Sequence, residues 1–302
     1  MTEASTFTIA SGGLSADIST LGAELQSLRD ARGRQLLWDG DPAVWAGRAP
    51  ILFPIIGMLA GGRYRLDGVS YAMPKHGIAR HALFDVVMHD DNAMVLRLLP
   101  DAQTRAAYPF AFRLDIAFTV TDALLRIVAT IANHDARPLP ASFGFHPALR
   151  WPLPFDRPRA DHRIRFEHDE AAAIRRIDSG GLLTAEAHPT PVVGNVLMLR
   201  DALFDDDALI FDAITSRRVS YGAAEGPRLD IGFEDFPTLG VWTKPGGAGF
   251  ICIEPWQGSS DPVGFDGEIY DKPGIVVIAA GESRSFTMTI ALNGIPMGGE
   301  PR

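Results

Sequence analysis

Apolar and polar residues alternate with a period of two along most of the chain, in short runs rich in Val, Ile, Phe and Leu. Gly, Asp, Asn and Pro separate these runs, an arrangement typical of antiparallel strands joined by turns. The strongest local signal is the Asp67-Gly68 turn between two short segments at 63–71, which predicts a hairpin. Further strands are predicted at 7–9, 24–28, 112–120, 124–133, 208–211, 219–221, 228–231, 249–254, 274–278 and 283–292.

Helical signals are few. Asp41 is a good N-cap for a short helix toward Trp45, and Asp101 is a good N-cap for another turn before a Tyr-Pro pair. The 30 Gly and 22 Pro residues are spread through the chain and would break long helices. We therefore expect an all-β fold with few short helices, a single large antiparallel β-sandwich domain over residues 1–302, with a frayed tail from residue 294.

Composition excludes several classes of function. The net charge of -9 and the pI near 5.3 disfavour nucleic acid or anionic membranes as partners, because like charges repel at long range. One cysteine, Cys252, excludes an internal disulfide framework and is compatible with a reducing cytosol. Residues 1–6 lack the pattern of a signal peptide, and the longest apolar stretch, 49–60, contains two prolines and is too short for a membrane helix. We expect a soluble, cytoplasmic protein.

Three short stretches each place one candidate proton-transfer side chain among apolar residues, beside a residue that changes the chain direction. They lie at 75–80, 143–149 and 250–256 and contain His76, His146 and Glu254. Two histidines and a carboxylate that converge on one site can move protons near neutral pH. Each alone has an ordinary structural explanation, since a buried His is often a hydrogen-bonded core residue and a Glu before proline can cap a turn.

Alternation along the predicted strands gives these side chains a direction. Glu254 lies on one strand face, with the two neighbouring isoleucines on the other. Pro255 lacks an N–H, so we expect strand pairing to stop at Glu254 and to present its carboxylate there. His146 lies opposite two phenylalanines, and Gly144, on its own face, would leave space for a ligand beside it. His76, between a proline and a glycine, is expected in a turn at the rim of a sheet.

Other chemistries find less support in the sequence. No serine or cysteine nucleophile motif accompanies the three stretches, and no glycine-rich phosphate loop opens a helix. A metal hydrolase that uses His76, His146 and a carboxylate is disfavoured, because neither a His-x-His nor a His-Glu-x-x-His spacing occurs around them.

Together, four segments carry a family resemblance. They are the apolar segment 49–57, the His-Gly-Ile-Ala-Arg motif at 76–80, Gly-Phe-His-Pro at 144–147 and Ile-Glu-Pro-Trp at 253–256. In this order the chain resembles the aldose 1-epimerase (mutarotase) family, particularly its less characterised bacterial branch, from about residue 21 to the final strand. The resemblance implies a galactose mutarotase-like supersandwich with a sugar site on its concave face, no metal or organic cofactor, and interconversion of sugar anomers.

The resemblance also implies roles for the three residues. Glu254 matches the family's base, His146 its acid, and His76 the second histidine, which orients the sugar near its ring oxygen. Opening a hemiacetal ring needs one group to take the anomeric hydroxyl proton and another to protonate the ring oxygen. For work near neutrality we expect an ionised Glu254 beside a protonated His146, a state that the proximity of opposite charges favours.

Three more residues are candidates for substrate binding. Arg80 can donate to sugar hydroxyls or a phosphate, although a surface ion pair is the ordinary role of such a residue. Asp207, in the acidic run 205–207, is expected to accept bonds from sugar hydroxyls, unless it lies in a solvated turn. Trp256 is a candidate platform for a sugar face, whereas we expect Phe145 to pack in the core.

Two rival interpretations remain at this point. The substrate can be a hexose 6-phosphate, which predicts that Arg80 and Lys75 converge beside the catalytic pair. Alternatively the domain binds or senses a sugar without catalysis, although binding alone needs neither an acid nor a base.

Overall fold

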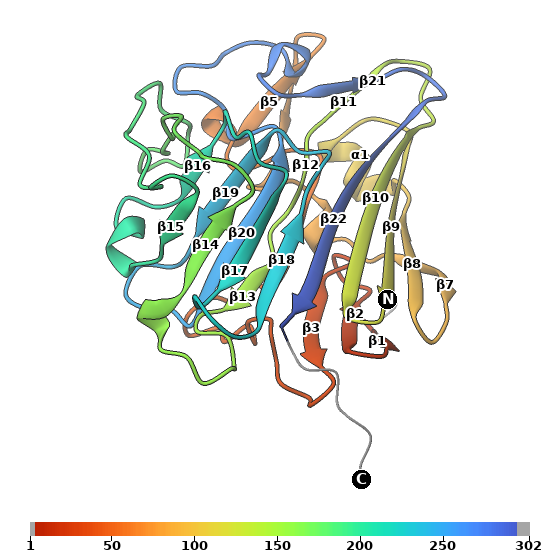
Figure 1. Cartoon of the computed structure of the whole chain (residues 1–302). Helices are drawn as coiled ribbons and strands as arrows, with labels where there is room; N and C mark the ends of the chain where they lie inside the picture. The colour runs from red at the N-terminus through yellow and green to blue at the C-terminus, as the bar shows by residue number, and fades with distance from the viewer. Residues whose placement is uncertain (1–3, 295–302) are drawn as a thin grey trace.

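Two large sheets of antiparallel strands form the body of the computed structural model, which describes residues 4–294 (Figure 1). The nine-stranded sheet has the order β15 (Val196–Met198), β14 (Arg163–Phe166), β17 (Arg218–Gly222), β18 (Arg228–Gly232), β22 (Ser283–Asn293), β10 (Leu124–Asn133), β9 (Phe112–Thr121), β8 (Ala93–Leu98) and β7 (Asp85–His89). The six-stranded sheet has the order β16 (Leu209–Phe211), β19 (Thr238–Trp242), β20 (Phe250–Gln257), β12 (Phe143–Phe145) and β4 (Ile51–Leu52), with β13 (Ala148–Arg150) also paired to β20.

Smaller elements complete the fold. They are the sheet β1 (Thr6–Ser11), β2 (Leu14–Ser19) and β3 (Leu25–Asp30), the hairpin β5 (Arg63–Leu66) and β6 (Val69–Ala72), the pair β11 (Leu139–Ala141) and β21 (Val276–Ile278), the helix α1 (Ala102–Ala107), and 3-10 turns at Ala60–Gly62, Ala79–His81, Arg159–Asp161, Asp201–Phe204 and Ile269–Asp271. No helix within residues 4–294 is long and apolar enough to cross a membrane.

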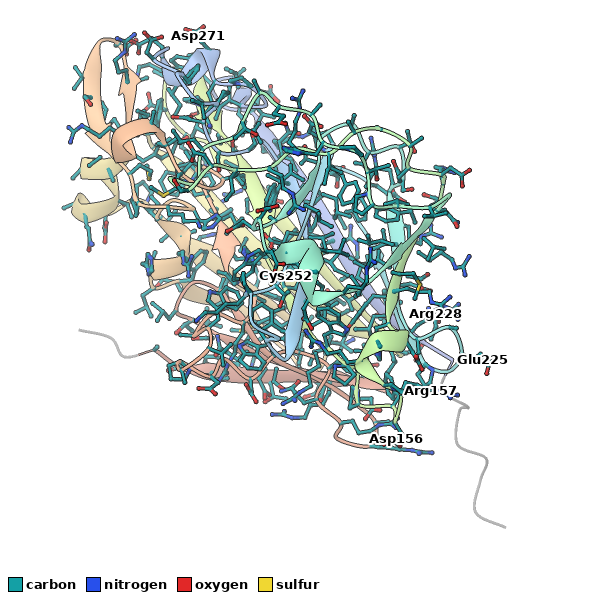
Figure 2. The ribbon with its side chains drawn as sticks, turned by 90° about the vertical axis from the view of Figure 1, so that its left-hand side faces the viewer. Asp156, Arg157, Glu225, Arg228, Cys252 and Asp271 are labelled. Carbon is teal, nitrogen blue, oxygen red and sulfur yellow. The ribbon has the colours of Figure 1, made fainter. Side chains whose placement is uncertain are left out.

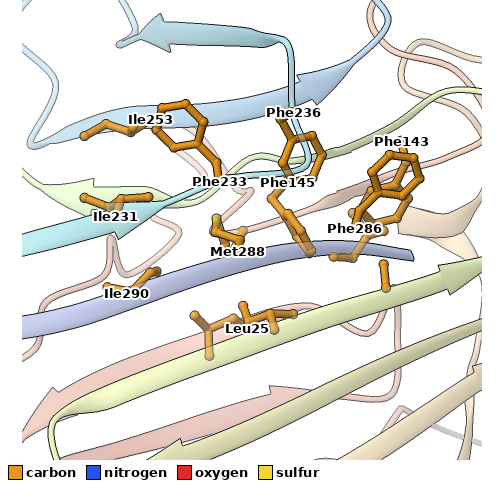
Figure 3. Close-up of a cluster of buried hydrophobic side chains, with 14 of the residues drawn as sticks. Leu25, Phe143, Phe145, Ile231, Phe233, Phe236, Ile253, Phe286, Met288 and Ile290 are labelled. Carbon is orange, nitrogen blue, oxygen red and sulfur yellow. The ribbon is translucent and has the colours of Figure 1, made fainter. Parts of the chain in front are cut away.

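One large apolar core lies between the two main sheets, because the strands present alternate side chains to it. Ile253 of β20 and Phe145 of β12 contribute from the six-stranded sheet, and Ile231 of β18 and Met288 of β22 from the nine-stranded sheet (Figure 3). The predicted inward direction of Phe145 is therefore confirmed.

The six-stranded sheet has a second covered face. Phe250 and Cys252 of β20 point away from the large core into a separate cluster with Trp38, and Trp256 belongs to a third cluster. The predicted alternation along this strand is thus confirmed, and Glu254 shares the face of Cys252. This outer face of the six-stranded sheet is where the candidate site lies.

The sandwich, the hairpin and the Asp101 cap are confirmed. Asp101 accepts the backbone N–H of Thr104 at 2.7 Å in a capping box that opens α1. The helix predicted after Asp41 is wrong: Asp41 accepts bonds from the N–H groups of Val44 and Trp45, but the chain leaves after this single turn. The frayed tail was predicted from residue 294 onward, and the residues after 294 lie outside the described chain.

The predicted end of pairing at Glu254 is also wrong, since β20 continues through Pro255 to Gln257. N–H groups alternate sides along a strand, and that of Ile253 points to the carbonyl of Pro147 at 3.4 Å. Pro255, two residues on, faces the same side, where the partner chain turns between β12 and β13 and leaves the ladder interrupted. The missing N–H of proline is tolerated there.

Candidate active site

Glu254 and His146 are in direct contact on the outer face of the six-stranded sheet. His146 lies in the turn between β12 and β13, both of which pair with β20, the strand that carries Glu254. His146 Nε2 is 3.1 Å from Glu254 Oε2, and the two residues are 7% and 1% exposed. Residues 108 positions apart along the chain are therefore brought together by strand pairing alone.

Aromatic rings hold the imidazole of His146 in this position. Trp45 stacks on it with ring centroids 5.2 Å apart, and Trp242 meets it edge-on at 5.9 Å. His146 Nδ1 is buried without a hydrogen-bond partner among the described residues, and the contact of Glu254 Oε2 with His146 Nε2 is not aligned as a hydrogen bond. Such unsatisfied polar atoms are rare in interiors and mark a place where a ligand can bond.

Burial works against the charged pair that we expected from the sequence. It lowers the pKa of His146 from 6.5 to about 3 and raises the pKa of Glu254 well above 4.5. Lys75 partly offsets this for Glu254 by favouring the carboxylate, whereas Asp207 adds to the upward shift of its pKa. Burial thus disfavours the charged form of each group, which opposes the ionised pair expected from the sequence.

The raised pKa of Glu254 predicts how stability depends on pH. Glu254 has a folded-state pKa above its ordinary value of 4.5, so its favourable contribution is present below that pH and is lost as pH rises through the folded-state pKa. Glutamine cannot lose a proton and avoids this loss. We therefore expect the Glu254→Gln variant to gain stability relative to wild type as pH rises from 5 to 8, measured by denaturant unfolding at each pH. A constant difference between the two proteins would contradict the shift.

His76 has one fixed protonation pattern. The N–H of Gly57 donates to His76 Nδ1 at 3.1 Å, so Nδ1 is an acceptor and the neutral ring carries its proton on Nε2. Burial, together with His146, Lys75 and Arg80, lowers the pKa of His76 well below 6.5. The turn predicted around it is present, with His76 at φ +65°. His76 is thus a neutral hydrogen-bond donor, and its ring lies edge-on to His146 at 5.7 Å.

Substitutions of His76 separate this donor role from folding. Glutamine reaches the position of Nε2 with an N–H, whereas asparagine ends one bond earlier but tolerates positive φ better. We expect His76→Asn to fold normally and to lose about 10²- to 10³-fold in kcat/KM for anomer exchange, as when one donor to a developing charge is removed. His76→Gln should retain most of the activity. Equal losses in the two variants would argue against a donor role.

Glu254 and His146 line a cavity of about 210 Å³, and the other residues predicted to bind substrate line the same cavity. Arg80, Asp207 and Trp256 all line it, as does Lys75. Gly144 does not: a Cβ on this residue would lie 2.8 Å from atoms of Ile56 and Trp256, so the space expected beside His146 is filled by those side chains. The full lining is Trp45, Gly57, Lys75, His76, Arg80, His146, Ile177, Gly181, Asp207, Ala208, Ile210, Trp242, Glu254, Trp256 and Ser260.

Arg80 has no assigned partner. It is half-buried, and it forms neither a hydrogen bond nor an ion pair with any of residues 4–294. Burial lowers the pKa of its guanidinium. Glu24 acts on the guanidinium electrostatically and partly offsets this shift of its pKa, but the described chain has no direct ion pair at Arg80, so its N–H donors can meet a ligand.

Asp207 is held by a residue that sequence reasoning missed. Arg176 donates from its guanidinium to the carbonyls of Leu203 at 2.9 Å, Asp207 at 2.7 Å and Ala208 at 3.2 Å, which fixes the loop at the cavity rim. The carboxylate of Asp207 accepts the N–H of Ala208 at 2.7 Å. One oxygen of this exposed carboxylate is thus engaged by the backbone, and the other remains available.

The aromatic lining was only partly anticipated. Trp45 and Trp242 join Trp256 around the cavity, although the sequence suggested only Trp256. The signal available was composition, because the chain has only 5 Trp and aromatic rings are favoured partners for sugar faces. The sequence could not predict that these tryptophans lie around one cavity, because Trp45 comes from a turn and Trp242 from the end of β19.

One set of side chains among residues 4–294 has the spacing of a metal site: His146, Cys252 and Glu254, whose ligand atoms lie within 4.8 Å of one another. It omits His76, which a metal hydrolase was expected to use. Cys252 is fully buried among aromatic rings, and burial raises the pKa of its thiol well above 9.0.

Comparison with known proteins agrees with the fold and the motifs. The sequence profile of the family described as Aldose 1-epimerase matches residues 5–276. The chain belongs to the aldose 1-epimerase family. It is 30% identical over 289 residues to the chromosomal LacX protein of Lactococcus lactis subsp. lactis, covering 92% of this chain and 96% of LacX.

Two solved structures of family members resemble it closely. One is a galactose mutarotase-like protein from Lactobacillus casei ATCC 334, with a TM-score of 0.89, 29% identity, and coverage of 96% of this chain and 100% of that one. The other is a galactose mutarotase related enzyme from Lactobacillus acidophilus, with a TM-score of 0.88, 26% identity, and coverage of 96% and 97%. The galactose mutarotase-like fold extends over nearly the whole chain.

Proposed function

We propose that this member of the aldose 1-epimerase family interconverts the α and β anomers of a hexose, with Glu254 and His146 as the proton-transfer pair. The observation that carries the proposal is their contact at 3.1 Å in the lining of a cavity, with His146 Nδ1 buried and without a hydrogen-bond partner among the described residues. A structural His–Glu pair would not need a cavity above it.

The direct contact fits the geometry of the substrate. His146 Nε2 and Glu254 Oε2 are only 3.1 Å apart, with no room for a sugar between them. The anomeric hydroxyl oxygen and the ring oxygen of a hemiacetal are bonded to the same carbon, so an acid and a base that serve them must lie side by side. The sugar then binds against both groups.

In the proposed reaction, the pair gains one proton from the sugar and gives one proton to it, so the total number of protons on Glu254 and His146 does not change. Glu254 takes the anomeric hydroxyl proton while His146 delivers a proton to the ring oxygen; the bond between the anomeric carbon and the ring oxygen breaks, and the hydroxyl oxygen becomes a carbonyl. Rotation about the adjacent carbon–carbon bond and the reverse transfers give the other anomer. Because burial favours a protonated Glu254, sugar hydroxyls that donate to this carboxylate must shift the proton to His146 before ring opening.

A second candidate substrate is a hexose 6-phosphate. It is supported by Arg80 and Lys75, which both line the cavity, and by the free donors of Arg80. A neighbouring cavity of about 500 Å³ shares Lys75 and Asp207 but adds Asp178 and Asp205, and these carboxylates would repel a phosphate. A neutral hexose is therefore the better-supported substrate.

The test is a panel of freshly dissolved pure anomers, free and 6-phosphorylated, followed by polarimetry or NMR exchange. Catalysed exchange of free hexoses, with the Arg80→Gln variant affecting free and phosphorylated sugars alike, would support the first proposal. Exchange that is restricted to phosphorylated sugars and is lost in Arg80→Gln would instead support a hexose 6-phosphate as the substrate. Sugar binding without exchange would replace both with a non-catalytic binding domain.

A further inference from the structure

A second pocket lies on the opposite outer face of the sandwich, on the nine-stranded sheet. Its volume is about 300 Å³, and it shares no residue with the cavity around Glu254. Its lining is positively charged, although the whole chain carries a net charge of -9. It is lined by Arg163, Arg165, Ser220, Gly222, Ala223, Ala224 and Arg228.

Strand register explains why three arginines meet there. Arg163 of β14 and Arg228 of β18 both pair with Gly222 of the strand between them, so the two arginines flank a residue without a side chain. Neighbouring strands are about 4.8 Å apart, which places the two backbones roughly 10 Å from each other. A Cβ at Gly222 would lie 3.0 Å from Cβ of Arg228, so glycine keeps the floor of the pocket open.

Two of these guanidinium groups have no partner. The side chains of Arg163 and Arg165 form no hydrogen bond or ion pair within residues 4–294, and Arg163 Nε is buried with no bond. The nearby carboxylate of Asp230 is occupied by Ser220, by Asn293 at 2.6 Å and by Arg228 at 3.3 Å. Asp230 therefore offsets the charge of Arg228, whereas half-buried Arg163 and exposed Arg165 keep theirs without an ion-pair partner among residues 4–294, and a bound anion would relieve the repulsion between them.

We propose that this arginine pocket binds a small phosphate-bearing anion. Arginine forks match phosphate oxygens, and the seven lining residues include no aromatic ring on which a nucleic-acid base could stack. The negative charge of the rest of the molecule repels an extended polyanion but leaves a bounded pocket open to a small one. Figure 2 labels one of the lining residues, Arg228, near the right-hand margin of the molecule.

Calorimetric titration with inorganic pyrophosphate tests the proposal. We expect saturable 1:1 binding to wild type, weakened about tenfold or more in Arg163→Gln/Arg165→Gln, since bonds to charged groups are strong. The matched control is Arg105→Gln/Arg126→Gln, which removes the same charge from exposed positions elsewhere and should bind as wild type does. Absence of binding to wild type, or an equal loss in both double variants, would overturn the proposal.

A spectroscopic measurement covers the case in which the double variant does not fold. In wild-type protein, the Nε–H resonance of Arg163 should shift on addition of pyrophosphate and remain unchanged on addition of a free hexose. A resonance that responds to neither pyrophosphate nor the hexose, or to both of them, would also refute the proposal that this pocket binds a phosphate-bearing anion. Because this pocket is separate from Glu254 and His146, neither outcome bears on anomer exchange.

Discussion

Glu254→Gln is expected to lower the catalysed rate of anomer exchange by about 10²- to 10⁴-fold, the contribution typical of one proton-transfer group. Glutamine has nearly the same shape and keeps a polar group beside His146 Nε2, but it cannot take the proton of the anomeric hydroxyl. The rate is measured from a freshly dissolved pure anomer by polarimetry or NMR exchange, with the spontaneous reaction subtracted.

Glu170 supplies the matched control for this variant. It is also a buried carboxylate, at 2% exposure, but it accepts the backbone N–H groups of Thr215 and Ser216 away from the cavity. Glu170→Gln should reduce stability and leave kcat unchanged. A Glu254→Gln protein with wild-type turnover would remove the base from the mechanism, whatever its stability.

His146→Asn should cause a second loss of about 10²- to 10⁴-fold, because asparagine cannot deliver a proton to the ring oxygen. In the proposed mechanism the pair acts as a unit, because ring opening needs both the transfer of the hydroxyl proton to Glu254 and the transfer of a proton from His146 to the ring oxygen. The double variant Glu254→Gln/His146→Asn is therefore expected to be little slower than either single variant. Fully multiplicative losses would show that the two residues act independently.

His162 provides the corresponding control. It is also buried, but its Nε2 accepts the N–H of Leu153 at 3.0 Å and its Nδ1 lies 3.0 Å from the carbonyl of Pro158, so both ring nitrogens have structural partners. His162→Asn should affect unfolding and not turnover. If it impaired exchange as strongly as His146→Asn does, the loss in the latter would reflect damage to the fold.

The strands that the sequence predicted well are those with strict alternation. Residues 124–133 were predicted with the bounds of β10, and the Asp67-Gly68 turn joins β5 and β6 as expected. Alternation also gave the direction of Glu254, because the period of a strand fixes which side chains share a face, whereas His146 lies in the turn just after β12. These features depend only on neighbours along the chain.

The errors have a common origin in tertiary contacts. Pro255 does not end β20, because the missing N–H falls where the partner chain interrupts the ladder. Gly144 makes room for Trp256 rather than for a ligand, and Trp45 reaches His146 from a turn that was predicted as a helix. Which partner stands opposite a residue is decided by strand order, and strand order leaves no local signal.

By itself the sequence determined the all-β class, the faces of the strands and the residue types able to move protons, since periodicity and side-chain chemistry are local properties. Only the tertiary structure decided that Glu254 and His146 touch, that Gly57 fixes the proton of His76, and that burial disfavours the charged form of each member of the pair. Distances and solvent exclusion arise from segments that meet far from each other in the chain, so the protonation state of the site is a property of the folded molecule.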